Sequence, residues 1–226
     1  MSNTLSLDAG RELRVDGEIT RNNILNHAEE LFSIRGYTGV SVREITNSVD
    51  VHVALINYHF GSKEKLFHEV LIRRVAKMSE RRIERLNAVT ISPNNRKAIE
   101  SILWAFIDPL IGESPEEVND LRNYRRLIAL VANSKTWQEV VFKEHYDSTA
   151  VKFIRAIQIA LPNNDGSDIF WGFNFFLGSL TNTIAETGRV DRISDGTCKS
   201  CDLKNASIQL VNYTTNALMG KNKGKY

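Results

Sequence analysis

Apolar residues recur at three- and four-residue spacing from residue 20 onward, which is the periodicity of an amphipathic α-helix. Thr20 can cap the start of the first helix, and Gly36 can end it because glycine tolerates the left-handed conformation common at helix C-termini. Residues 1–17 have no such periodicity and are predicted to form a flexible arm. The first helical stripe consists of Ile24, Leu25, Ala28, Leu31 and Phe32.

Two short helices are predicted to follow. Ser41 and Glu44 in the run SVRE have the spacing of a capping box, so a helix is expected to start there. A break at 50–52 separates it from a very short helix over residues 53–59. Two short helices joined by a tight turn form a helix-turn-helix unit, whose second helix enters the DNA major groove.

A fourth helix is predicted over residues 63–86, after the Gly-Ser step. Free backbone amides at a helix start favour phosphate, and Lys63 and Lys65 bring positive charge to the same place. Tyr58 and His59 offer hydrogen-bonding groups at the preceding helix end. The combination predicts DNA binding. The alternative is that the two rings only cover a small core and that the lysines are solvated.

Residues 18–67 resemble the DNA-binding domain of the TetR (tetracycline repressor) family, through RGYTGVSVREI followed by LINYHFGSKEKLF. The resemblance implies base contacts from the third helix and backbone contacts from the starts of the second and fourth. His52 stands where many members have Ser, and Val53 where many have Lys; Val53 could pack on a thymine methyl group. The implied DNA-binding residues are Ser41, Arg43, Val53, Ala54, Asn57, Tyr58, His59 and Lys63.

The larger C-terminal part also has helical periodicity. Pro109 is expected to end or kink a helix over 97–112, and SPEE (114–117) is another helix start. A long helical stretch over 136–161 is expected to bend or split near Asp147. No strand alternation occurs, so the predicted fold is all-α. The predicted divisions are an N-terminal arm (1–17), a helix-turn-helix domain (18–67), a helical effector-binding and dimerisation domain (68–220) and a basic tail (221–226).

The last two predicted helices span about 167–187 and 202–219. The first is apolar on nearly every face and therefore needs a partner surface. The resemblance implies a four-helix dimer interface here, and two-fold symmetry would set two recognition helices about 34–36 Å apart on a palindromic operator. The expected interface residues are Phe170, Trp171, Phe175, Leu177, Leu180, Ile184, Leu210 and Tyr213.

TetR-family members commonly bind a small effector in the C-terminal domain, so the resemblance also implies a pocket. The fourth helix, which would join both domains, is the expected lever. Aromatic residues at helical spacing are more often plain core, whereas buried polar groups such as His145 and Asn174 need partners. The candidate lining residues are Trp104, Phe106, Tyr124, Trp137, Phe142, His145, Tyr146, Phe173 and Asn174.

The composition is that of an ordinary globular protein, with 226 residues, 42% hydrophobic and 25% charged. The longest apolar run, over 169–180, is too short to span a bilayer, and the N-terminus has no signal-peptide pattern; a cytoplasmic location without membrane contact is expected. The net charge is only +2, so DNA binding must depend on where charges lie. Basic residues gather in 73–85, as a solvated face or a source of long-range attraction to DNA.

Cys198 and Cys201 form a CKSC motif without nearby further ligands, so two reduced thiols are expected rather than a zinc site, with a redox switch or partial metal site as alternatives. No cofactor or metal is predicted.

Catalysis is not expected either, because nucleophile motifs and phosphate-binding glycine loops are absent. The nearest arrangement of potentially catalytic residues is His145 with Glu144 and Asp147. Two hypotheses remain: an effector-released, dimeric repressor, or a DNA-binding adaptor that docks a protein.

Overall fold

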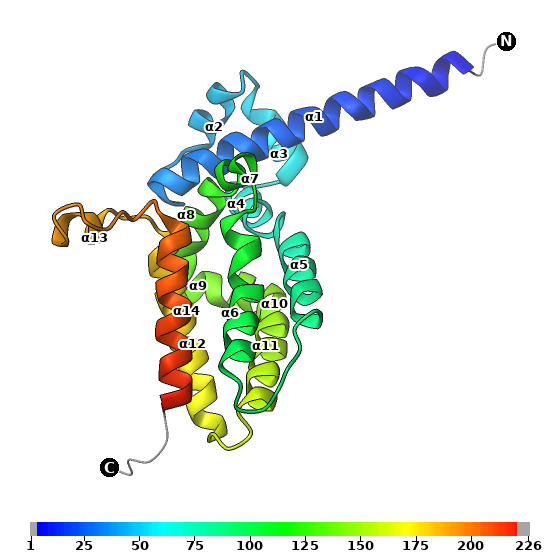
Figure 1. Ribbon diagram of the computed structural model, residues 1–226. Helices are drawn as coiled ribbons and strands as arrows, with labels where there is room; N and C mark the ends of the chain where they lie inside the picture. The colour runs from blue at the N-terminus through cyan, green and yellow to red at the C-terminus, as the bar shows by residue number, and fades with distance from the viewer. Residues whose placement is uncertain (1–3, 221–226) are drawn as a thin grey trace. The chain divides into compact units, whose positions relative to one another are not determined.

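The computed structural model describes residues 4–220, which fold into helices joined by turns (Figure 1). Those residues contain no strand, which confirms the predicted all-α fold. The chain forms two compact units, one ending at Arg73 and the other beginning at Arg74. The predicted basic tail at 221–226 lies outside the described residues.

The first unit has a small core between four helices. Phe32 and Phe67 meet edge-on with ring centroids 4.8 Å apart, and Ile45 and Ile56 are fully buried beside them. Burying each such side chain contributes about 1.5–3 kcal/mol. The helices are α1 (Thr4–Arg35), α2 (Val42–Ser48), α3 (Val53–Phe60) and α4 (Lys63–Ile72).

Helix α1 begins at Thr4, so the predicted start at Thr20 is wrong. The preceding segment has no apolar stripe and includes Gly10 and Gly17, but it contains no proline, so none of its residues excludes a helix. Of the predicted arm over residues 1–17, the structure describes the backbone from Thr4 onward as helical. The predicted end is confirmed, because Gly36 has φ +68° and its amide donates to the Phe32 carbonyl at 2.9 Å.

The predicted fourth helix is interrupted after Ile72, and α5 (Val75–Asn87) starts beyond a turn at Arg73 and Arg74. Arg73 donates to the buried carboxylate of Glu29 at 2.5 and 2.9 Å, inside the first unit. Arg74 pairs with Asp120 at 2.5 and 3.0 Å, inside the second unit. Each arginine is therefore fixed by a carboxylate of its own unit, which corrects the prediction of one continuous helical lever.

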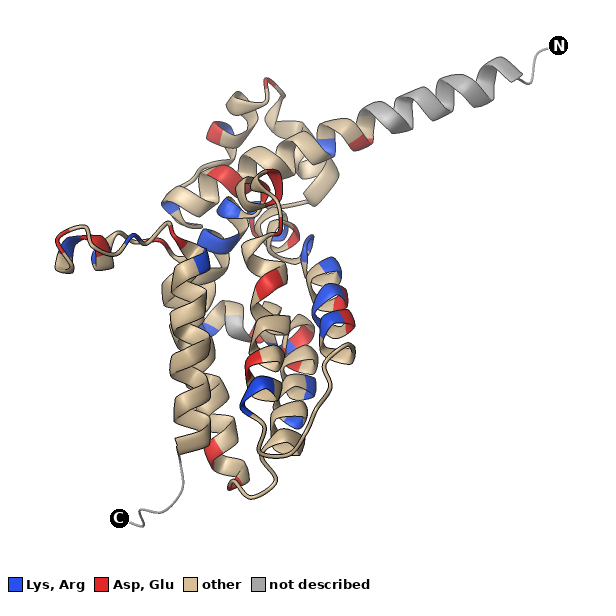
Figure 2. Cartoon of the chain, viewed as in Figure 1, with Lys and Arg blue, Asp and Glu red and all other residues tan. Residues whose placement is uncertain are grey.

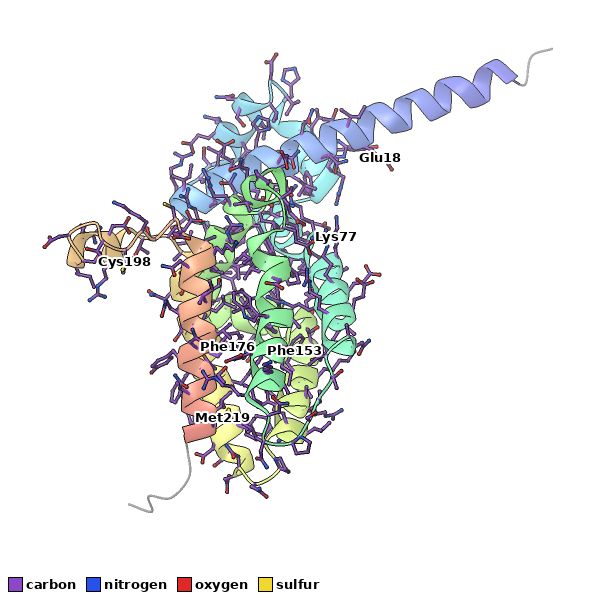
Figure 3. The ribbon with its side chains drawn as sticks, in the orientation of Figure 1. Glu18, Lys77, Phe153, Phe176, Cys198 and Met219 are labelled. Atoms are coloured by element: carbon purple, nitrogen blue, oxygen red, sulfur yellow. The ribbon has the colours of Figure 1, made fainter. Side chains whose placement is uncertain are left out.

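The second unit is a helical bundle around an aromatic core. The Phe106 ring lies edge-on to Phe153, Phe173 and Phe176, with centroids 5.0, 5.6 and 5.8 Å away. Figure 3 labels Phe153 and Phe176 in this bundle. Helices α12 and α14 pack side by side along the bundle (Figure 1). Besides α5, the helices are α6 (Arg96–Ile111), α7 (Pro115–Asp120), α8 (Arg122–Val131), α9 (Lys135–Trp137), the π-helix η1 (Gln138–Phe142), α10 (Lys143–His145), α11 (Asp147–Ala160), α12 (Gly166–Ile184), α13 (Arg189–Ile193) and α14 (Leu203–Gly220).

Most of the predicted boundaries in this unit are confirmed. Ser114 caps α7 by accepting from the Glu117 amide at 3.2 Å, and the long stretch over 136–161 divides where α11 starts at Asp147. Helix α6, however, continues through Pro109 to Ile111, because a proline this close to the C-terminus disturbs only the last turn. No helix in the described part of the chain is long and apolar enough to cross a bilayer.

Candidate functional site

The start of α2 is fixed by the predicted capping box. Ser41 Oγ accepts from the Glu44 amide at 3.2 Å, and the Glu44 carboxylate accepts from the Ser41 amide at 2.7 Å. Arg35, at the end of α1, donates to the same carboxylate at 2.6 Å. These bonds, that from Arg35 first, lower the pKa of Glu44 to about 2. The carboxylate therefore stays charged at neutral pH and ties α2 to the end of α1.

Helix α3 is anchored on one side and open on the other. Ile56 and Phe60 are buried in the core of the first unit, whereas Tyr58 is 81% exposed. His59 is half-buried beside Tyr58, with ring centroids 5.0 Å apart, so it is less open than the sequence suggested. The exposed residues, called the α3 face below, are Val53, Ala54, Asn57 and Tyr58.

The neighbouring helix starts carry the other predicted DNA-binding residues. Ser41 and Arg43 are exposed at the start of α2. Lys63 is half-buried at the start of α4, and its Nζ lies 4.2 Å from the centroid of the Tyr37 ring. Burial lowers the pKa of Lys63. Tyr37 was not singled out from the sequence, because its role depends on a contact with a residue far along the chain.

His52 occupies the N-cap position of α3 and makes no side-chain capping hydrogen bond. A serine hydroxyl could accept from a free amide of the first turn, so His52→Ser is expected to raise the free energy of unfolding by about 0.5–1 kcal/mol. Urea denaturation of the whole chain measures the change. His52→Ala is the matched control, since it removes the ring without adding a cap. Equal stability of the two variants would contradict the capping argument.

The second unit contains a cavity of about 340 Å³, lined by residues of α5, α6, α8, η1, α11 and α12. Five of the nine predicted lining residues border it: Phe106, Tyr124, Phe142, Tyr146 and Asn174.

The other four predicted lining residues lie elsewhere. Trp104 borders a surface groove, Phe173 lies in the aromatic core, and Trp137 is buried away from the cavity. His145 is half-buried outside the lining, with its Nε2 atom 3.9 Å from the Glu144 carboxylate. Helical periodicity could not separate these residues from the true lining, because it does not show which apolar positions face this cavity.

Arg82 also lines the cavity, although no sequence pattern singled it out. Its side chain is 4% exposed, and its guanidinium carbon lies 3.7 Å from the centroid of the Phe106 ring. Its Nε atom donates to the Phe106 carbonyl at 2.9 Å. The Tyr124 and Tyr146 hydroxyls meet at 2.5 Å in the same wall.

Two further arginines of the basic segment over 73–85 are paired with carboxylates. Beyond the pairs at the unit boundary, Arg81 binds Glu117, and Arg85 binds Asp108 at 3.0 Å and Glu113. Helix α5 accordingly carries interleaved basic and acidic residues (Figure 2). These arginines are structural partners rather than a free cationic surface.

An exposed aromatic cluster lies on α12 and α14. Trp171 and Phe175 stack at 5.8 Å, and Phe170 and Tyr213 are exposed as well. Figure 2 shows both helices almost without charged residues along their length. Several large exposed apolar side chains on neighbouring helices are typical of protein interfaces.

The other four predicted interface residues are not available on that surface. Leu180, Ile184 and Leu210 are buried in the chain's own core, and Leu177 is half-buried against the cavity. Apolar periodicity on every face of α12 did not distinguish the side that packs inside the chain from the side left open.

The two cysteines lie in the segment between α13 and α14. Cys198 and Cys201 are exposed free thiols. Figure 3 labels Cys198 on this segment. Among the described residues, no group of three or more potential metal-ligating side chains gathers anywhere.

Comparison with known proteins gives consistent matches. The family described as bacterial regulatory proteins, tetR family, matches residues 24–70, and the tetracyclin repressor-like C-terminal domain matches residues 104–217. The HTH-type transcriptional repressor NicS of Pseudomonas putida is 46% identical over 52 residues, which are 23% of this chain and 24% of that protein. The probable HTH-type transcriptional regulator YttP of Bacillus subtilis is 28% identical over 146 residues, 65% of each chain.

A solved structure shares the fold. The TetR-like transcriptional regulator from Rhodococcus sp. RHA1 superimposes with a TM-score of 0.63 and 17% identity, covering 89% of this chain and 97% of its own. The chain thus spans less than two thirds of the length of the two sequence relatives but nearly all of this structure. Together the matches confirm the family resemblance seen in the sequence.

Proposed function

Because the chain belongs to the TetR family of bacterial transcriptional regulators, we propose that it is a dimeric repressor that leaves a palindromic operator when a small molecule fills its cavity. The observation that carries this proposal is the α3 face, which is an exposed surface on a short helix. The opposite side of that helix is buried in the core of the first unit. Members of this family are generally not enzymes, and the proposal includes no catalytic step.

The α3 face supplies the base contacts in this proposal. Asn57 can hydrogen-bond base edges in the major groove, Tyr58 is 81% exposed and can reach them as well, and Val53 suits a thymine methyl group. Ser41 and Arg43 would hold phosphates at the start of α2. Lys63 would do so at the start of α4, where its ammonium group already lies over the Tyr37 ring.

The exposed cluster on α12 and α14 supplies the dimer interface. Trp171, Phe175 and Tyr213 would be covered by the same surface of a second copy, because a two-fold interface is self-complementary. Such symmetry places two α3 faces about one DNA turn, roughly 34–36 Å, apart.

Release requires an effector that binds more tightly to the state whose α3 faces do not match the operator. The cavity residue Tyr124 lies against Arg74, whose guanidinium carbon is 6.0 Å from the ring centroid. Arg74 is the first residue of the second unit and directly follows the DNA-binding unit in the chain. A ligand that displaces Tyr124 would therefore act on the connection to the DNA-binding unit. A preformed cavity also favours a small effector over a docked protein.

Fluorescence anisotropy tests the DNA-binding claim with DNA from upstream of the chain's own gene and with scrambled DNA of equal length. We expect the native fragment to bind at least a hundredfold more tightly at moderate salt. Tyr58→Ala is expected to weaken this binding at least about 30-fold, because a lost base contact costs about 1–3 kcal/mol and a dimer loses it twice.

Ile159→Ala serves as the control, since Ile159 is exposed on α11 in the other unit. It is expected to leave both affinities unchanged. Equal, salt-sensitive binding of the native protein to both fragments would count against regulation at its own gene, and full affinity in Tyr58→Ala would count against the α3 face.

A further inference from the structure

The cavity of the second unit contains a cation without a counter-ion. Among the described residues, no carboxylate lies within ion-pair distance of Arg82, and only its Nε atom has a hydrogen-bond acceptor. Burial lowers the pKa of Arg82 to about 10, so the guanidinium is still charged at neutral pH. Keeping a buried charge without a partner is costly, which makes the arrangement unusual unless something else supplies the negative charge.

The other deeply buried arginine of this unit shows the contrast. Arg125 forms an ion pair with Glu186 at 3.6 Å and donates to the carbonyl of Val118 at 3.1 Å. Arg125 is not among the residues that line the 340 Å³ cavity. Within one bundle, the buried arginine away from this cavity has its counter-ion, and the one in its wall has none.

The wall beside Arg82 can also donate a hydrogen bond. Tyr124 and Tyr146 share a hydrogen bond between their hydroxyls, in which either oxygen can be the donor. Burial, and then Tyr124, raise the pKa of Tyr146 well above its ordinary value, so its hydroxyl stays protonated. Phe142 stacks on Tyr146 with centroids 5.0 Å apart and holds that ring in place.

The remaining lining residues are apolar where they are buried and polar where the cavity meets solvent. Met78, Leu110 and Leu180 are buried side chains that offer only apolar contact. The other polar lining residues, Asn133, Asp147, Asn174 and Thr181, are exposed or half-buried, so the one acidic group, Asp147, lies on the solvent side. A ligand that matched these walls would be apolar over most of its surface and anionic at one end.

We propose that the cavity binds a small organic acid whose carboxylate pairs with the Arg82 guanidinium and accepts from the Tyr124–Tyr146 hydroxyl pair. This assignment rests on the proposed function, since it names the chemical class of the effector. Arginine is suited to the role because its planar fork can hold both carboxylate oxygens. The volume of about 340 Å³ lies at the small end of the range for ligand pockets, which favours a compact acid.

Isothermal titration calorimetry on the full chain tests the assignment with matched pairs of ligands. The probes are benzoate and benzamide, phenylacetate and phenylacetamide, and hexanoate and hexanamide, which differ in charge but hardly in shape. At least one acid is expected to bind about 10- to 100-fold more tightly than its amide, as a charge-assisted hydrogen bond would give.

Arg82→Met removes the charge while keeping much of the side chain's volume, and is expected to abolish the preference for the acid without weakening the amide. Its thermal midpoint without ligand should not fall, because an uncompensated buried charge is replaced by an apolar group. Arg82→Lys keeps the charge without the fork and should retain a smaller preference. Lys77→Met, an exposed cation on the same helix, is the matched control and should keep the full preference.

The possible failures are distinguishable. If no acid binds more tightly than its amide, or if Arg82→Met keeps the preference, the assignment of an anionic ligand is overturned; release of DNA by neutral compounds would still support the proposed function. If acids bind through Arg82 but leave the DNA complex intact in an anisotropy assay, the ligand class is upheld and the proposed release mechanism fails.

Discussion

Replacement of Phe175 by Glu is expected to separate the two protomers and to weaken operator binding by about 10²–10⁴-fold. Phe175 is 61% exposed and stacks on Trp171 on the exposed apolar side of α12. A charge there would have to be buried without a partner in the dimer. Without the dimer, each α3 face binds its half-site alone, and the gain in affinity from linking two binding sites is lost.

Size-exclusion chromatography with light scattering measures the first effect, and anisotropy with the operator measures the second. Leu130→Glu is the matched control, because Leu130 is also an exposed apolar residue but lies on α8. It should remain dimeric and bind DNA normally. A native protein that is already monomeric, or a Phe175→Glu variant that stays dimeric, would show that this surface is not the interface.

Replacement of Arg125 by Ala is expected to lower the free energy of unfolding by roughly 3–5 kcal/mol, the usual cost of breaking a buried ion pair. Arg125 is 1% exposed, and the Glu186 carboxylate that it faces is 8% exposed. The guanidinium also donates to the carbonyls of Leu110 and Ile111, at 3.4 and 3.5 Å, near the end of α6. Removing it leaves a buried carboxylate and free helix-end carbonyls.

Urea denaturation of the whole chain measures this loss. Arg126→Ala provides the comparison, because Arg126 approaches the same carboxylate at 3.8 Å but is 37% exposed, so it should cost less than about 1 kcal/mol. Glu186→Gln in the Arg125→Ala background should recover part of the loss, since a neutral amide is less costly to bury. Equal costs for the two arginines would contradict the argument from burial.

The features that could be predicted from the sequence depend on residues close together in the chain. The Ser41–Glu44 capping box and the Ser114 cap each involve residues three positions apart, and both are present. Gly36 ends α1 through its own backbone conformation. His52, which stands where many family members have Ser, makes no capping hydrogen bond, and this too depends on one residue type at one position.

The features that were missed depend on partners far along the chain. The helix break after Ile72 contains neither glycine nor proline; its two arginines bind Glu29 and Asp120, more than forty positions away. Arg82 could not be separated from its neighbours, because only the folded bundle shows that it turns inward while Arg81 and Arg85 meet carboxylates. The exposed side of α12 could not be predicted from the sequence either, because this helix is apolar on nearly every face.

In the proposed function, the chain recognises a two-fold symmetric DNA site through paired α3 faces. Selection of bound sequences from a random double-stranded DNA pool, with the full chain at moderate salt, tests it most directly. We expect an enriched palindrome with half-sites about 10–10.5 base pairs apart, or a multiple of that spacing, and no such palindrome with Tyr58→Ala. Enrichment of a site without two-fold symmetry, or the same site with Tyr58→Ala, would contradict the account.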